Sequence, residues 1–207
     1  MTKVIVLIPA HNEEERIVDA ILSAKNQSRK PDQIVVMSDN STDATVQIAQ
    51  NMGVDVVESI GNDKKKAGAL NQVFLGYLKH EDDETYVLIQ DADTELSPNF
   101  VEAALKAMED RTVGAVGGIF LGDGKNGLLG DCQNLEYVRY AREIGRAKGE
   151  AKVLTGTSTF TRVGILREVK NQRVAGKLPQ SARDGDVYNT YALTEDFELT
   201  LCIKKLG

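Results

Sequence analysis

The sequence predicts an α/β fold in which a mostly parallel central sheet carries helices on both faces. Apolar runs of about five residues, typical of strands buried on both faces, alternate with stretches of helical periodicity. The chain has 207 residues, a length that suits one domain of this kind. Because the ligands of such sheets bind at the carboxyl ends of the strands, we expect the functional groups there.

The first half of the chain repeats one unit, a strand followed by a helix. The run from Val4 to Ile8 stops at Pro9, and apolar residues at helical spacing follow from Glu13. The later units predict strands at 33–37, 54–58 and 86–90, a helix at 41–52 that ends at Gly53, and a helix at 66–78. This alternation predicts parallel strands joined by right-handed crossovers.

The second half of the chain is less regular. Pro98 precedes a predicted helix at 100–108, and a strand is expected at 113–119. Four glycines predict a flexible loop at 122–130, before a long polar helix at 132–148. Residues 153–162 are rich in Thr and are expected to be extended. Residues 167–193 show weak periodicity, which predicts a long loop that closes over a site or is disordered.

The composition excludes several classes of function. With 25 Lys and Arg against 31 Asp and Glu, the net charge of −6 argues against nucleic acid or an anionic membrane as the main partner. Two cysteines and two histidines at scattered positions encode neither a zinc site nor a disulfide framework. No apolar run is long enough for a membrane span, so we expect a cytoplasmic chain whose metal ligands, if any, are carboxylates.

Carboxylates follow two of the predicted strands. The segment Asp91-Ala92-Asp93 comes directly after the strand at 86–90, and two carboxylates with one spacer suit a divalent cation shared with a diphosphate. Taken alone, this pattern also fits a surface turn. Asp39 follows the strand at 33–37 and is expected to face the cleft, while Ser41 or Thr42 can cap the next helix. A plain capping loop is the alternative for that segment.

Three other nucleotide or metal motifs are absent. A calcium loop starting at Asp39 is excluded, because Ala44 occupies the position that needs Gly and Gln50 the position that needs a bidentate Glu. Neither a Walker lysine loop nor Gly-x-Gly-x-x-Gly follows the first strand, which argues against nucleotide hydrolases and nicotinamide dehydrogenases.

Five segments that appear in one order carry a family resemblance. They are Pro9-Ala10-His11-Asn12-Glu13, Ser38-Asp39-Asn40-Ser41-Thr42-Asp43, Lys66-Ala67-Gly68-Ala69-Leu70-Asn71, Asp91-Ala92-Asp93 and Thr194-Glu195-Asp196. Each is weak alone, but in series they are specific and cover nearly the whole chain. The sequence resembles the catalytic domain of a glycosyltransferase family 2 enzyme, which implies the Rossmann-like GT-A fold.

The resemblance implies a role for each matching residue. The nucleoside would be held by Pro9, His11, Glu13 and Asp39. Lys66 would approach the nucleotide or diphosphate, Asp91 would contact the ribose or sugar, and Asp93 of this DXD motif would ligate Mn²⁺ or Mg²⁺. In the family's second motif two acidic residues precede a Gly; here Ser38 and Asn40 replace the outer two, so Asp39 is the single acidic contact. Thr157 and Ser158 would form the floor of the sugar pocket, although an ordinary Thr-rich strand is an equal alternative.

The last segment supplies the candidate catalytic carboxylates, Asp196 with Glu195 beside it. A carboxylate can take the proton from an acceptor hydroxyl as that hydroxyl attacks the anomeric carbon. Attack on the face opposite the diphosphate inverts the anomeric centre, as the resemblance implies. The segment is also a suitable helix start, with Thr194 as the cap. Both interpretations are compatible.

The implied function is therefore transfer of a sugar from a nucleotide sugar to a glycan, lipid or protein acceptor. UDP is the favoured nucleotide, with TDP and GDP as alternatives, and residues 133–142 resemble a helix of polysaccharide synthases. We expect residues 1–207 to form one catalytic domain, either naturally compact or part of a longer chain at the cytosolic face of a membrane. A sugar nucleotidyltransferase and a binding module without activity are the competing hypotheses.

Overall fold

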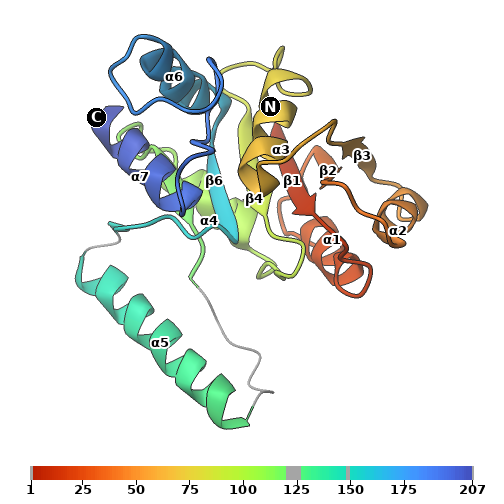
Figure 1. Cartoon of the computed structure of the whole chain (residues 1–207). Helices are drawn as coiled ribbons and strands as arrows, with labels where there is room; N and C mark the ends of the chain where they lie inside the picture. Colours follow the sequence, from red (N-terminus) through yellow and green to blue (C-terminus); the bar gives the residue numbers. More distant parts are fainter. Residues whose placement is uncertain (1, 120–126, 148–149, 207) are drawn as a thin grey trace.

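The computed structural model describes residues 2–119, 127–147 and 150–206, which form a central sheet flanked by helices (Figure 1). The six strands lie in the order β3-β2-β1-β4-β6-β5. They are β1 (Val4–Ala10), β2 (Gln33–Ser38), β3 (Asp55–Glu58), β4 (Tyr86–Gln90), β5 (Ala115–Gly117) and β6 (Ser158–Arg162). The pairs among β1 to β4 are parallel, and β6 is antiparallel to both of its neighbours. The predicted mostly parallel α/β sheet is confirmed.

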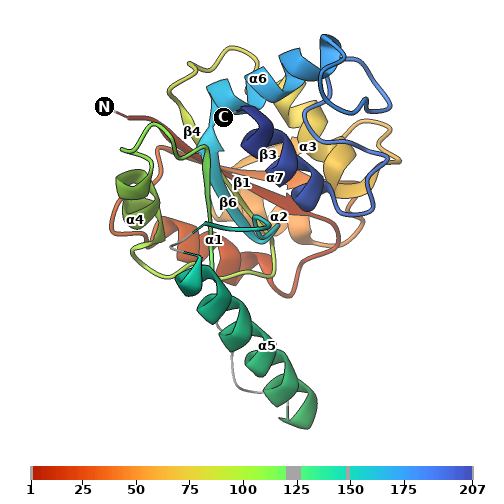
Figure 2. The same ribbon diagram turned by 90° about the vertical axis from the view of Figure 1, so that its left-hand side faces the viewer.

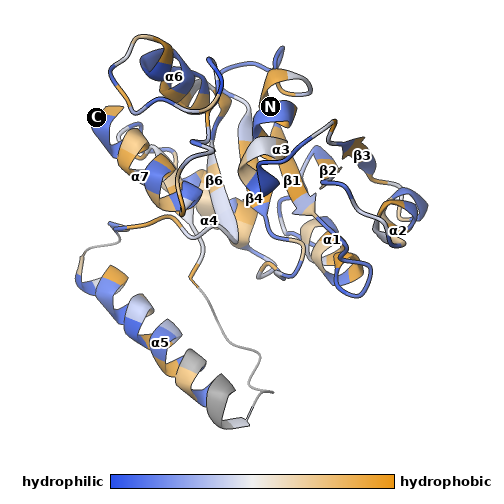
Figure 3. Cartoon of the chain, in the orientation of Figure 1, coloured by the Kyte–Doolittle hydropathy of each residue, from blue (hydrophilic) through white to orange (hydrophobic). Residues whose placement is uncertain are grey.

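Helices cover both faces of this sheet, and each face has its own hydrophobic core. Side chains from α1 (Ile17–Lys25), α2 (Thr45–Asn51) and α4 (Phe100–Ala107) pack on one face. Side chains from α3 (Lys65–Leu75), α6 (Val163–Val174) and α7 (Glu195–Leu206) pack on the other. In Figure 3, α6 and α7 alternate between hydrophobic and hydrophilic residues, as expected for helices with one face on a core.

The first half of the chain follows the predicted elements, with shifted boundaries. β4 covers the predicted 86–90, whereas β1 continues through Pro9 to Ala10. Helices α1 and α2 begin four residues later than the expected 13 and 41, because residues 11–16 and 39–44 form loops that bond to each other. The N-cap of α2 is Ala44, which has no capping side chain, so neither Ser41 nor Thr42 caps the helix as expected. Asp43 accepts from the amide of Thr45, the first residue of α2, at 3.0 Å.

The second half departs further from the sequence-based prediction. The expectation of one long loop at 167–193 is wrong over its first part, because α6 is helical to Val174. Its periodicity is weak because Arg173, a charged residue, is buried on the core face. Only β5 and β6 form within the expected strands at 113–119 and 153–162. Of the predicted loop at 122–130, residues 122–126 lie outside the described residues, and Gly127 already belongs to α5.

Helix α5 (Gly127–Arg146) extends away from the sheet and the other helices in both views of the chain (Figures 1 and 2). The Tyr140 hydroxyl donates to the carbonyl oxygen of Val153 at 2.8 Å, which ties the helix to the segment before β6. Within the described part of the chain, neither α5 nor any other helix has the length and apolar character that crossing a bilayer requires.

Candidate active site

Polar residues of the candidate site gather where β1, β2 and β4 end. These three strands are parallel neighbours, so their carboxyl ends meet at one edge of the sheet. Helix α3 begins at Lys65 and helix α7 at Glu195. The contacts described below place the first turns of both helices beside the same edge of the sheet. The fold thus brings together side chains that lie up to about 180 residues apart in sequence.

Asp39 lies at the end of β2 and is held firmly by its neighbours. Its Oδ1 accepts from the Ser59 hydroxyl at 2.7 Å, the Asn62 amide at 2.8 Å and the Asn40 amide at 3.0 Å. Its backbone amide donates to the carbonyl oxygen of Ala10. Within the described residues no donor contacts Oδ2, so this oxygen can accept a hydrogen bond from a ligand such as a nucleobase.

The loop after β1 packs beside Asp39 through a set of hydrogen bonds. His11 Nδ1 lies 2.5 Å from the carbonyl oxygen of Asp39, and since a carbonyl only accepts, Nδ1 carries the proton. The Glu13 amide donates to Thr45 Oγ1 at 2.8 Å. Pro9 is half-buried in β1 and pairs with Met37 of β2. All four residues predicted to hold the nucleoside therefore belong to β1, β2 and their adjoining loops.

Lys66, in the first turn of α3, is the cation at the centre of the site. Its ammonium donates to Asp91 Oδ1 at 2.6 Å and to the carbonyl oxygen of Gly156 at 2.8 Å. The Asp91 amide in turn donates to the carbonyl oxygen of Thr157 at 3.0 Å. These bonds join α3, the end of β4 and the segment before β6 at one point.

The carboxylate of Asp196 completes this cluster from the first turn of α7. It packs directly on Gly156, where a Cβ would clash with Oδ2. Burial raises the pKa of Asp196 to about 6; Glu195 and Asp91 also raise it, and the Lys66 ammonium lowers it. Burial likewise raises the pKa of Asp91 despite the ion pair with Lys66. Four of the predicted residues thus form one electrostatically coupled group.

Asp93 is the candidate metal ligand, and its side chain is exposed beside this group. The pKa of Glu13 is raised, first by burial and then by the charge of Asp93, so the two carboxylates face one region. Among the described residues no three His, Cys, Asp or Glu side chains are arranged to hold a metal ion by themselves. One or two carboxylates that share a cation with substrate phosphates are nevertheless a common arrangement for Mg²⁺.

The structure does not bring every predicted residue to the cluster in the same way. Thr157 reaches Asp91 through its backbone carbonyl, as described above. Ser158 is only 5% exposed, and its hydroxyl lies against Gly118, where an added Cβ would clash with it. Glu195 contributes charge near Asp91 and Asp196.

Two residues that the sequence analysis did not single out hold Asp39 in place. Ser59 and Asn62 both donate to its Oδ1. They follow β3 directly, and the rule that groups gather at the carboxyl ends of parallel strands applies equally to that strand. The signal was therefore present in the sequence, in the polar segment after the predicted strand at 54–58.

Comparison with known proteins places this arrangement among glycosyltransferases. The family model described as Glycosyl transferase family 2 matches residues 5–170. The hyaluronan synthase of Streptococcus pyogenes is 28% identical over 92% of this chain and 48% of its own length. The chain thus spans about half the length of the curated relatives it matches.

Two solved structures share the fold. The mannosyltransferase PcManGT from Pyrobaculum calidifontis, solved in complex with GDP-Man and Mn²⁺, superposes with a TM-score of 0.61 at 22% identity, covering 89% of this chain and 50% of that one. TarS 1–349 from S. aureus, in complex with UDP-GlcNAc, gives a TM-score of 0.61 at 19% identity over 91% of this chain and 52% of that one.

Proposed function

The chain belongs to glycosyltransferase family 2 and has the GT-A fold, and from this premise we propose that it is an inverting, metal-dependent transferase. It moves a sugar from a UDP-sugar to an acceptor hydroxyl of a glycan, lipid or protein at the cytosolic side. The observation that carries the proposal is the cluster of Lys66, Asp91 and Asp196 around Gly156 at the carboxyl ends of the strands.

The donor's nucleotide would bind over the ends of β1 and β2. Asp39 offers Oδ2 to the base, and the loops of His11 and Glu13 pack beside it. Uracil presents an N–H that can donate a hydrogen bond to a carboxylate, which supports UDP as the nucleotide. TarS 1–349 was solved with UDP-GlcNAc, which supports the same choice. PcManGT was solved with GDP-Man, so GDP is the competing nucleotide that an experiment must test.

The carboxylates near the donor fit a divalent cation. Asp93 is exposed, and it lies close enough to Glu13 for its charge to raise the pKa of that carboxyl. Its carboxylate offers the hard oxygen ligands that Mn²⁺ and Mg²⁺ prefer. Asp93 would hold the ion, and the donor diphosphate would supply other ligands. When bound, such an ion supplies neutralisation of the charge that develops on the departing diphosphate.

The acceptor is activated by Asp196. Its carboxylate takes the proton of the acceptor hydroxyl as that oxygen forms a bond to the anomeric carbon. The bond from the anomeric carbon to the diphosphate oxygen breaks, and the diphosphate leaves with the electron pair. Because the pKa of Asp196 is raised to about 6, the carboxylate is ionised at neutral pH yet basic enough to hold the proton. Lys66 orients Asp91 and fixes the carbonyl of Gly156 beneath Asp196.

The first test is calorimetric titration of UDP, GDP, TDP and ADP into the protein, each with and without Mn²⁺. Of the four nucleotides, we expect only UDP to bind well. Its affinity should be higher with Mn²⁺ than without, and Asp93→Ala should lose this gain. Asp63→Ala, which removes an exposed aspartate that pairs with Lys64, is the matched control. Binding of none of the four nucleotides would contradict the proposal.

A second assay identifies the reaction itself. Incubation with UDP-sugars and a mixture of acceptors should release UDP, which a coupled enzyme assay detects. Release of pyrophosphate from UTP and a sugar 1-phosphate in a parallel incubation, with no UDP released from the UDP-sugars, would instead identify a nucleotidyltransferase. Binding without turnover, unchanged in Asp196→Asn, would identify a binding module.

A further inference from the structure

Residues 179–190, which we call the brace, cross from the end of α6 towards the start of α7 and have no regular secondary structure. Hydrogen bonds from α3 and from α6 nevertheless hold this segment in place. Val187 and Tyr188 are buried, each only 1% exposed, in the core that α3, α6 and α7 share. The brace is therefore an integral part of the fold on the side of the sheet that carries Lys66 and Asp196.

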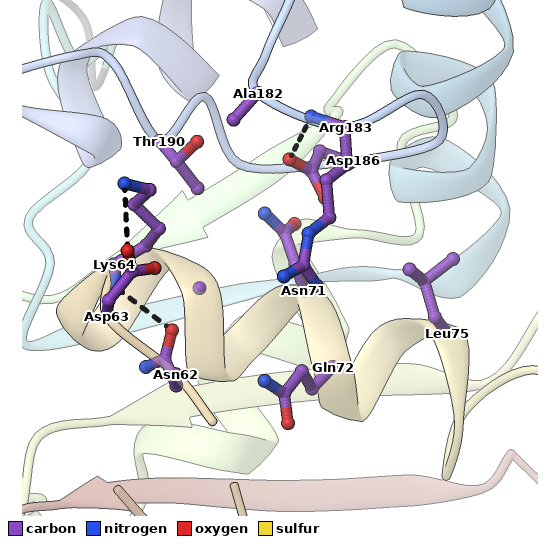
Figure 4. Close-up of a pocket in the computed structure, with 11 residues that line it drawn as sticks. Asn62, Asp63, Lys64, Asn71, Gln72, Leu75, Ala182, Arg183, Asp186 and Thr190 are labelled. Carbon is purple, nitrogen blue, oxygen red and sulfur yellow. Dashed lines mark hydrogen bonds and ion pairs between the residues drawn. The ribbon is translucent and has the colours of Figure 1, made fainter. Parts of the chain in front are cut away.

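Asn71 joins the brace to α3. Its Oδ1 accepts from the amides of Val187 and Tyr188, both at 2.9 Å, and its Nδ2 donates to the carbonyl oxygen of Tyr188, also at 2.9 Å. Figure 4 shows the side chain of Asn71 pointing from α3 towards the segment that carries Arg183 and Asp186. Asn71 is 4% exposed, so its three bonds are made without competition from water.

Arg173, in the last turn of α6, joins the same brace to α7. Its guanidinium donates to the carbonyl oxygens of Val187 at 3.0 Å and Pro179 at 2.5 Å. It also forms a two-pronged ion pair with Glu198, two residues after Asp196. Arg173 is 2% exposed, and a bidentate pair of this kind fixes orientation as well as distance.

The side chain of Tyr188 extends this connection towards the catalytic carboxylates. The pKa of its phenol is raised well above its ordinary value, first by burial and then by the charges of Asp196, Glu195 and Asp91. The phenol is thus within electrostatic range of the cluster, while its own backbone is fixed by Asn71. The groups that face Asp196 are Lys66 from α3, Asp91 after β4, Glu195 on α7 and Tyr188 from the brace.

We propose that the brace positions the carboxylate of Asp196 relative to Lys66, and that Asn71 and Arg173 are the positioning residues that act through it. The proposal rests on the proposed function for its effect on turnover, but not for its effect on the surroundings of Asp196. Asn71 lies five residues, or about 1.4 helical turns, after Lys66 on α3, and Glu198 lies two residues after Asp196 on α7. Movement of the brace therefore changes both sides of the cluster.

The test compares Asn71→Ala and Arg173→Lys with Gln172→Ala. Gln172 neighbours Arg173 on α6, but its amide donates to Glu168 on the helix surface, which makes it a matched control. We expect kcat to fall about 10- to 100-fold in the first two variants, since a misplacement of about 1 Å can cost that much. The dissociation constant of UDP, measured by calorimetry, should change less than about twofold. Unchanged UDP binding also shows that each variant is folded.

A second readout does not depend on turnover. The pKa of the Asp196 carboxyl, followed by carbon-13 NMR, should move from about 6 towards its ordinary value in both variants, because water reaches the displaced carboxylate. If wild type transfers no sugar, the proposed function fails, and this titration still tests the brace. Values of kcat and pKa equal to those of Gln172→Ala would overturn the proposal, as would a parallel loss of UDP binding. Should Asn71→Ala fail to fold, Arg173→Lys, which keeps the charge opposite Glu198, decides.

Discussion

The loops that follow β1 and β2 lie at the same edge of the sheet as the cluster around Lys66. The two regions differ in how far their polar and charged groups are paired. In the loops, polar groups satisfy one another. Asn12 Oδ1 accepts from the Thr42 amide at 2.7 Å, and a Glu14 carboxylate oxygen accepts from the Ala44 amide at 2.9 Å. Asn12 and Asn40 both adopt left-handed backbone conformations, with φ of 55°. Both side chains are bonded, Asn12 as described and Asn40 by donating to the carbonyl oxygen of Asn62 at 3.1 Å.

In the cluster, charges are left in excess. Among the residues that the structure describes, Lys66 is the one lysine that faces the three carboxylates of Asp91, Glu195 and Asp196. Burial together with mutual repulsion raises the pKa of Asp91 and Asp196. Under the proposed function, this difference assigns binding and proton transfer to different regions. A satisfied and rigid region suits recognition of a nucleoside, whereas a group whose pKa is displaced from its ordinary value suits proton transfer. Changes in the two regions should therefore separate binding from turnover.

The largest separation is expected for Asp196→Asn. The amide has the shape of the carboxylate but cannot take a proton, so kcat should fall about 1000-fold while the affinity for UDP stays the same. Steady-state kinetics and calorimetry measure the two effects. Asp19→Asn, the same change in the first turn of α1, is the control. An equal loss of binding and turnover would show that Asp196 has a structural role.

A smaller but more local effect is expected for Gly156→Ala. The added Cβ would clash with Asp196 Oδ2, so the carboxylate must move while its chemistry is retained. We expect kcat to fall about 100-fold, since placement of the base is lost. The control is Gly145→Ala on α5, where an added Cβ meets no atom within 4 Å. Wild-type kcat in Gly156→Ala would mean that the base lies elsewhere.

The opposite pattern is expected for Asp39→Ala. Under the proposed function Asp39 is the charged acceptor for the donor base, so its removal should weaken UDP binding about 10- to 100-fold, because hydrogen bonds to charged groups contribute about 1.5–3 kcal/mol. At saturating donor, kcat should be close to that of wild type. Calorimetry and the dependence of rate on donor concentration check this. A fall in kcat without a change in affinity would reverse the division between the two regions.

The sequence predicted the positions of these two regions better than the contacts within them. Strands buried on both faces are continuous apolar runs, so 86–90 was located to the residue, and the strand-end rule then brought Asp39, Asp91 and Asp93 to one edge. The bond of Lys66 to Gly156, 90 residues away, has no local signature. The same is true of the brace, since the bonds of Asn71 reach 117 residues along the chain. Such pairings depend on the packing of whole elements.

The smallest expected effect concerns the stability of the fold. The same burial that raises the pKa of Asp196 makes its ionised carboxylate lower the free energy of unfolding. The pKa of Asp196 is about 6 in the folded chain and 3.8 for an ordinary aspartate, as in the unfolded chain, so between these values the folded state binds more protons than the unfolded state. The free energy of unfolding therefore falls as pH rises through this window, and the ionised carboxylate destabilises the fold above pH 6. Asp196→Asn removes that charge. We expect the variant to be more stable than wild type by about 1–2 kcal/mol at pH 8, a value reduced for solvent screening at this partly buried group.

The gain in Asp196→Asn should shrink towards zero below about pH 4, where the wild-type carboxyl is neutral in both states. Urea unfolding at pH 4 and pH 8 measures the two differences, with Asp19→Asn as the exposed control, for which no gain is expected at either pH. A variant that is destabilised at pH 8 would mean that the carboxylate is stabilised by its surroundings, as Asp39 is by its three donors. In that case the cluster would not be a region of excess charge, and Asp196 would not be poised to take a proton at neutral pH.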